Sequence, residues 1–159
     1  MNLLDRILFK LGFEPKNANQ FISKFMLVSK SKRFQLEMIS GNKILLQVDA
    51  LKFVNSWFDL LKIDKKLYKN GYVIFFVLKK DNIEQNPSYV KLINSGLDLY
   101  RIDENLFDEK VVTFCDCLPS TSTNLVLANR MREIINSVYF FEEENPQILF
   151  NIREILIEG

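Results

Sequence analysis

The sequence has no histidine and little cysteine, glycine or proline. Its 159 residues include two cysteines, five glycines and four prolines. Histidine titrates near neutral pH and is the usual base beside a nucleophile, so Ser-His-Asp and Cys-His arrangements cannot be built within this chain. Zinc sites with histidine ligands are excluded for the same reason. We therefore expect no enzyme and no cofactor, although chemistry based on carboxylates or lysine stays open.

Phosphate-binding glycine loops and long apolar runs are also missing. The glycines are scattered along the chain and form no nucleotide-binding motif. The longest apolar run, Tyr72 to Leu78, is far shorter than the roughly 18 residues that span a bilayer. Residues 1–10 are interrupted by Asp5 and Arg6 and make a poor signal peptide. With few cysteines as well, the expected compartment is the reducing cytoplasm.

What is present is the composition of a folded globular domain. Hydrophobic residues make up 48% of the chain and charged residues 26%. A chain this apolar can offset the entropy cost of ordering by burial, so disorder is not expected. We expect one compact domain over residues 1–159.

Hydrophobic spacing in the first fifty residues predicts a helix and then a hairpin. Residues 2–12 carry a helical apolar stripe, whereas 18–29 fit either a helix or a buried strand. Residues 33–39 and 43–49 alternate between apolar and polar side chains. Turn-forming residues lie between these two stretches, so the pair predicts a β-hairpin.

The middle of the chain predicts a broad helix followed by a central strand. Residues 50–61 carry an apolar helical stripe that Asp49 can cap. A basic connection, 62–70, follows it. Residues 72–78 are apolar at successive positions, which favours a strand covered on both faces.

The last part predicts two further strands between helices. Asn86-Pro87 begins a short helix over 87–95. Strands are expected at 97–103 and 110–118, with an acidic turn between them. Helices are expected from about 124 to 138 and at 146–157. This order favours an α+β domain with a largely antiparallel sheet of about five strands and flanking helices.

The order of elements from about residue 88 to 138 has a known counterpart. A helix ending at Leu92-Ile-Asn-Ser-Gly96 is followed by Leu97-Asp-Leu-Tyr-Arg-Ile-Asp103. The strand Lys110-Val-Val-Thr-Phe-Cys-Asp-Cys-Leu-Pro119 then leads to a helix after Ser120-Thr-Ser-Thr123. This pattern resembles the class I type III secretion chaperone fold and its YbjN-like relatives. The resemblance implies a non-catalytic homodimer that binds an extended partner segment in apolar grooves.

Two small clusters have candidate chemistry but favour a structural interpretation. Cys115 and Cys117 point to one face of a strand, where a zinc site would need ligands that the chain lacks. Two buried small hydrophobic side chains are the favoured interpretation. Glu142, Glu143 and Glu144 could ligate a divalent cation, but an exposed loop is expected instead. No metal site is therefore predicted.

The two halves of the chain carry opposite charge. Residues 1–80 hold 15 basic and 6 acidic residues, a net of +9, and residues 81–159 have a net of −8. The basic residues include two clusters that could bind an anion, Lys30, Lys32 and Arg33, and Lys62, Lys65, Lys66 and Lys69. Phosphate binding would use them. The favoured alternative is that charges of the two halves neutralise one another in space.

The high aromatic content is the strongest hint of a binding surface. Fourteen phenylalanines, five tyrosines and one tryptophan are many for a chain of this length, and aromatic side chains are enriched at interfaces. The candidate partner-binding residues are Phe53, Trp57, Phe58, Tyr139, Phe140 and Phe141. A dense core that takes up these aromatic side chains is an equally favoured alternative. The sequence thus favours a cytoplasmic protein-binding module, chaperone-like or an adaptor, which binds a partner or itself. The alternative is a nucleic-acid-binding accessory subunit that uses the basic half.

Overall fold

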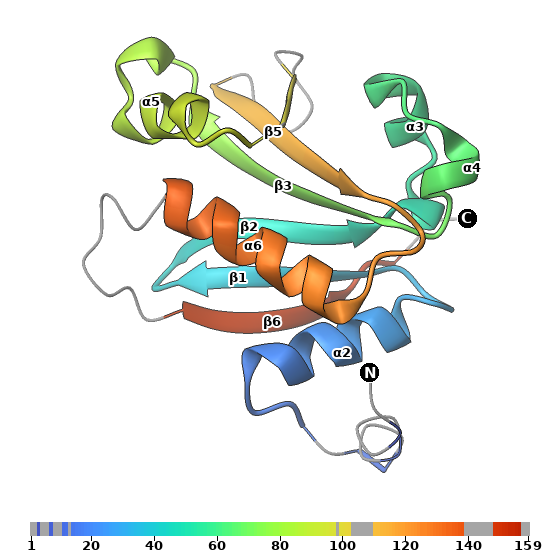
Figure 1. Ribbon diagram of the computed structural model, residues 1–159. Helices are drawn as coiled ribbons and strands as arrows, with labels where there is room; N and C mark the ends of the chain where they lie inside the picture. The colour runs from blue at the N-terminus through green and yellow to red at the C-terminus, as the bar shows by residue number, and fades with distance from the viewer. Residues whose placement is uncertain are drawn as a thin grey trace.

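An antiparallel sheet of six strands organises the molecule, in the order β4-β5-β3-β2-β1-β6 (Figure 1). The computed structural model describes residues 3, 7, 11, 12, 14–97, 99–102, 110–138 and 148–156. The strands are β1 Phe34–Ser40, β2 Lys43–Ala50, β3 Tyr72–Lys79, β4 Tyr100–Ile102, β5 Val111–Leu118 and β6 Ile148–Glu154. The α+β class and the antiparallel sheet are confirmed, with one strand more than expected.

Helices lie on both faces of this sheet. They are α2 Ala18–Val28, α3 Ser56–Leu61, α4 Lys65–Tyr68, α5 Pro87–Asn94 and α6 Asn124–Val138, with 3-10 turns at Leu51–Phe53 and Ile83–Gln85. Helices α2, α5 and α6 supply residues to the main core, and α3 covers the opposite face. The predicted N-terminal helix, 2–12, and the acidic turn, 103–109, lie mostly or wholly outside the described residues.

Strand β3 lies near the middle of the sheet and packs on both faces, as its sequence predicts. Ile74 and Phe76 point into the main core, beside Phe25 of α2 and Leu127 of α6. The side chains that alternate with them join a second cluster under α3. That second cluster consists of Leu51, Trp57, Phe58, Leu61, Val73, Phe75, Ile102, Cys115 and Cys117.

The local signals for turns and caps correspond to observed structure. Strands β1 and β2 form the predicted hairpin, and Gly41 between them has a φ of +59°, which glycine adopts without strain. The Asn86 side chain accepts a hydrogen bond from the Ser88 amide at 2.9 Å and caps α5. Asn17 caps α2 by accepting from the Gln20 amide at 3.0 Å, which settles 18–29 as a helix.

The helix predicted over 146–157 is wrong. Residues 148–154 form β6, which pairs with β1 along its whole length. Ile148, Phe150 and Ile152 alternate toward the main core, so the segment also has a strand period. Strand β1 would otherwise leave unpaired peptide groups at the edge of the sheet, and β6 satisfies them.

The helix predicted over 50–61 is broken, and Asp49 does not cap it. The chain forms a 3-10 turn at Leu51–Phe53, leaves helical geometry at Val54 (φ −131°) and resumes as α3. Asp49 belongs to β2, and its carboxylate pairs with Arg33 instead. The break allows Leu51 and Trp57 both to reach the second cluster. The strand predicted at 97–103 is also shorter, because only β4 pairs with β5.

Candidate functional site

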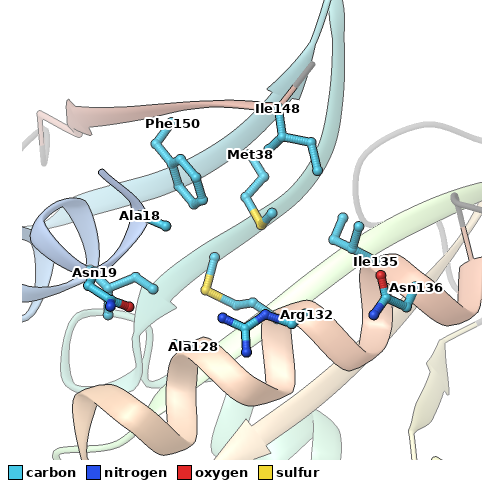
Figure 2. Close-up of a pocket in the computed structure, with 11 residues that line it drawn as sticks. Ala18, Asn19, Met38, Ala128, Arg132, Ile135, Asn136, Ile148 and Phe150 are labelled. Atoms are coloured by element: carbon cyan, nitrogen blue, oxygen red, sulfur yellow. The ribbon is translucent and has the colours of Figure 1, made fainter. Parts of the chain in front are cut away.

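An apolar groove lies between α2 and α6, on the face of the sheet that packs against the main core (Figure 2). Its volume is about 290 Å³, roughly twice that of an apolar cavity that holds a benzene ring. Side chains from α2, α6, β1 and β6 line it: Ala18, Asn19, Ile22, Met38, Ala128, Met131, Arg132, Ile135, Asn136, Ile148 and Phe150. We call this cavity the α2/α6 groove.

Small side chains explain why the two helices leave space here. At one end, Asn124 of α6 donates from Nδ2 to Ser23 Oγ of α2 at 2.6 Å, which holds the helices together. Farther along, the groove is bordered by Ala18 and Ala128, whose methyl groups fill little volume. The space between the helices is therefore a groove open to solvent with mainly apolar walls.

The rim of the α2/α6 groove is polar and reaches solvent. Asn19, Arg132 and Asn136 are exposed, whereas Met131 and Ile135 are buried in the wall. The guanidinium of Arg132 donates to Asn129 Oδ1 at 3.3 Å and keeps further donors. The groove thus combines an apolar interior with a positive charge at its mouth.

Two of the three described residues of the predicted aromatic surface are buried. Trp57 and Phe58 are each only 6% exposed and belong to the second cluster. Trp57 stacks on Phe75 with ring centroids 6.0 Å apart. Phe53 is half-buried and packs against the main core. The other three candidates, Tyr139, Phe140 and Phe141, lie outside the described residues.

The predicted basic residues gather at the end of the sheet where β1 and β3 begin. Lys62, Lys65, Lys66 and Lys69 are all exposed, in and around α4. Arg33 forms an ion pair with Asp49 at 3.0 Å, and Lys32 with Glu154 at 3.7 Å. Two members of the first cluster are thus paired with carboxylates, but only the Lys32–Glu154 pair joins the basic half of the chain to the acidic half. Lys30 instead lines a polar pocket at this end.

The two cysteines are buried on one face of β5, as expected for small apolar side chains. Burial raises the pKa of the Cys117 thiol to about 12, and burial together with the Cys117 and Asp116 charges raises the pKa of Cys115 further still. Both thiols therefore stay protonated at neutral pH. Because the thiolate is the nucleophile and the metal ligand, neither cysteine is poised for chemistry.

These thiols predict a stability loss in alkali. Above their ordinary pKa of 9.0 the unfolded thiols ionise, while the folded ones keep their protons, so the folded state binds more protons. The free energy of unfolding should then fall as the pH rises through 9, by about 1 kcal/mol per thiol at pH 10. Urea unfolding at pH 8 and pH 10 measures this fall. The double variant Cys115→Ala/Cys117→Ala should lose much less between the two pH values, and an equal loss would contradict the assignment.

A polar network occupies the face of β1, β2 and β6 that points away from the main core. Arg33 donates two hydrogen bonds to the Asp49 carboxylate, from Nε at 3.3 Å and from Nη2 at 3.0 Å. Glu37 accepts from Gln47 at 3.2 Å and from Asn151 at 3.1 Å, and pairs with Arg153 at 3.2 Å. The seven members of this polar network are Arg33, Gln35, Glu37, Gln47, Asp49, Asn151 and Arg153.

The two carboxylates of the polar network are buried, whereas Asn151 and Arg153 at its outer edge are exposed. Glu37 is 4% exposed and Asp49 is 1% exposed. Each carboxylate faces one arginine and at least one amide donor, which is the arrangement that buried carboxylates require. The alternation of apolar and polar residues in 33–39 predicts that Gln35 and Glu37 point away from the core. It does not predict that these two polar side chains are buried.

Further findings concern metal sites, membrane-spanning helices and the similarity of the chain to known proteins. In the described part of the chain, no group of three or more cysteine, aspartate or glutamate residues could hold a metal ion, and no helix is long and apolar enough to cross a bilayer. Glu142, Glu143 and Glu144 lie outside that part. No family model, no curated protein and no solved structure matches the chain.

Proposed function

We propose that this protein is a non-catalytic, cytoplasmic protein-binding module, similar in use to a secretion chaperone or adaptor. In this proposal a short segment of a partner protein inserts apolar side chains into the α2/α6 groove. The observation that supports it is the apolar groove, open to solvent, between α2 and α6. The resemblance to the secretion chaperones in the sequence pattern points the same way.

The chemistry of the groove favours a peptide that is both aliphatic and acidic. Met38 and Met131 border the space, and methionine adapts its shape to different apolar side chains. Arg132 at the rim can meet an acidic residue of the segment. Asn19 and Asn136 can donate to or accept from the backbone of the segment.

The buried carboxylates do not favour an enzyme. Glu37 and Asp49 lie on the sheet face opposite the α2/α6 groove and are held by arginine and amide donors. A catalytic acid or base needs a proton that it can exchange with a substrate in a cleft. Asp49 lines a pocket of about 200 Å³ together with Arg33 and Trp57, but Arg33 and Gln35 hold its carboxylate there. The missing histidine removes the commonest catalytic base.

The nucleic-acid alternative has weaker support. Arg33 and Lys32 are paired with Asp49 and Glu154, which lowers the positive charge of the first basic cluster. The lysines around α4 are exposed, which also fits a solvated face.

A random peptide display library tests the proposal, with the folded protein as bait. We expect enriched peptides to combine leucine, isoleucine or phenylalanine with aspartate or glutamate. Ala128→Phe fills the groove and should weaken binding of these peptides about tenfold or more, because the anchor pocket is lost. Arg132→Glu should weaken the acidic peptides selectively.

The control places the same ring on the exposed side of the same helix. Val126 is exposed and does not line the groove, so Val126→Phe should leave peptide affinity unchanged. Circular dichroism checks that all three variants fold. Peptides that bind wild type and Ala128→Phe equally would contradict the proposal. Self-association that Ala128→Phe abolishes, measured by sedimentation, would make a second copy the occupant.

A further inference from the structure

A second cavity opens at the basic end of the sheet, away from the α2/α6 groove. Its volume is about 430 Å³. Four chain segments meet around it: the end of α2, the end of β2, the start of β3 and the turn after β5. The lining residues are Met26, Ser29, Lys30, Ala50, Lys52, Asn70, Tyr72, Ser120 and Ser122. We call this cavity the basic pocket.

The basic pocket carries positive charge. Two lysines line it, and no carboxylate is among the described residues that do. Lys52 Nζ donates to the backbone oxygen of Lys30 and lies 4.9 Å from the centroid of the Phe53 ring, which places its ammonium beside the cavity. An ammonium group has three donors, so Lys52 retains donors for a ligand.

Neutral hydrogen-bond donors accompany the two lysines. Ser120 and Ser122 bring hydroxyl groups, and Asn70 brings an amide. The Ser120 hydroxyl accepts from the Asn70 backbone amide at 2.9 Å, which orients this side of the pocket. Ammonium, hydroxyl and amide donors around one cavity are the set that binds phosphate oxygens.

A buried hydroxyl also lies in the wall. Ser29 is 1% exposed and lines the basic pocket. Its Oγ lies beside the Tyr72 phenol. Burial raises the pKa of Tyr72, with the Ser29 hydroxyl offsetting part of the rise, so the phenol stays protonated. A hydroxyl can donate to one group and accept from another, so Ser29 adds a donor to those that line the cavity.

We propose that the basic pocket binds the phosphate group of a small phosphomonoester. A doubly charged phosphate would lie between Lys30 and Lys52 and accept from the serine hydroxyls. The cavity is larger than a free phosphate needs, which leaves room for the organic part of the ligand. This proposal uses none of the residues of the α2/α6 groove and does not depend on peptide binding there.

Titration calorimetry at low ionic strength tests the basic pocket with three ligands: ribose 5-phosphate, inorganic phosphate and an oligonucleotide. The oligonucleotide has no terminal phosphate, so it offers only phosphodiester groups. We expect ribose 5-phosphate to bind with a dissociation constant at or below about 1 mM. Lys52→Gln should weaken it about tenfold, because a charged hydrogen bond is lost. Inorganic phosphate that binds as tightly as ribose 5-phosphate would identify the free ion as the ligand and overturn the phosphomonoester assignment.

Two further variants keep this test decisive. Lys80→Gln removes the same charge at the other end of β3 and should leave the affinity unchanged. Ser29→Ala should lower the affinity severalfold, because a donor in the wall of the pocket is removed. The proposal would be overturned if neither ribose 5-phosphate nor inorganic phosphate bound. It would also be overturned if Lys52→Gln and Lys80→Gln weakened the binding equally. Tighter binding of the oligonucleotide would also overturn it, in favour of the nucleic-acid alternative.

Discussion

Replacing Gly71 with alanine should lower the free energy of unfolding by about 3 kcal/mol or more. A Cβ at this position would lie 2.0 Å from the carbonyl oxygen of Leu118 and 3.1 Å from the backbone carbons of Leu118 and Pro119. These are backbone atoms, which cannot rotate away as a side chain does. Relief therefore requires the start of β3 and the end of β5 to separate.

Hydrogen bonds oppose that separation from both sides. The Gly71 amide donates to the Tyr68 carbonyl at 2.8 Å, and the Gly71 carbonyl accepts from the Leu51 amide at 3.0 Å. Tyr72, the next residue, is already paired with Leu118 in the sheet. A shift of Gly71 would thus disturb α4, the turn after β2 and the sheet together.

Urea unfolding followed by circular dichroism measures the effect, with Gly96→Ala as the matched control. Gly96 has a φ of +76° and open space where a Cβ would be, so its cost is conformational only, about 1 kcal/mol. The loss in Gly71→Ala should clearly exceed this. Equal losses in the two variants would show that the strands do not approach as closely as the structure describes.

Local patterns in the sequence predicted those elements whose partners are close along the chain. The β1/β2 hairpin follows from alternation on both sides of Gly41, and α5 follows from the Asn86-Pro87 cap. The helix prediction for residues 146–157 was wrong because the spacing of Ile148 and Ile152 fits both a strand and a helix. What decides is the unpaired edge of β1, more than a hundred residues earlier in the chain, and no local window contains it.

The candidate site was less accessible to sequence reasoning than the fold. A cavity is an absence of side chains, so the α2/α6 groove has no motif of its own. The high aromatic content predicts a binding surface near Trp57, because aromatic side chains are enriched at interfaces. The second cluster on the other sheet face receives Trp57 and Phe58 instead. The basic pocket joins Lys30 to Ser120 across four chain segments, and only the sheet order brings them together.

The polar network should contribute to stability as a coupled unit, and the pair of Arg33 and Asp49 measures it. Asp49→Ala should lower the free energy of unfolding by about 3 kcal/mol, because Arg33 and Gln35 lose their shared acceptor. Arg33→Met leaves a buried carboxylate with only Gln35 as a partner and should be similarly costly. The double variant Arg33→Met/Asp49→Leu should recover part of the loss, since apolar side chains replace both charges.

A double-mutant cycle in urea gives the coupling energy, which we expect to exceed about 1 kcal/mol. Losses that add within about 0.5 kcal/mol would mean that the two side chains act independently and would contradict the assignment. The sign of the Asp49→Ala effect also bears on function. Residues that form an active site often hold unfavourable arrangements, and their removal tends to stabilise the protein. A large loss in Asp49→Ala would therefore identify the polar network as structural, whereas a gain would direct attention from the α2/α6 groove to carboxylate chemistry on the opposite face of the sheet.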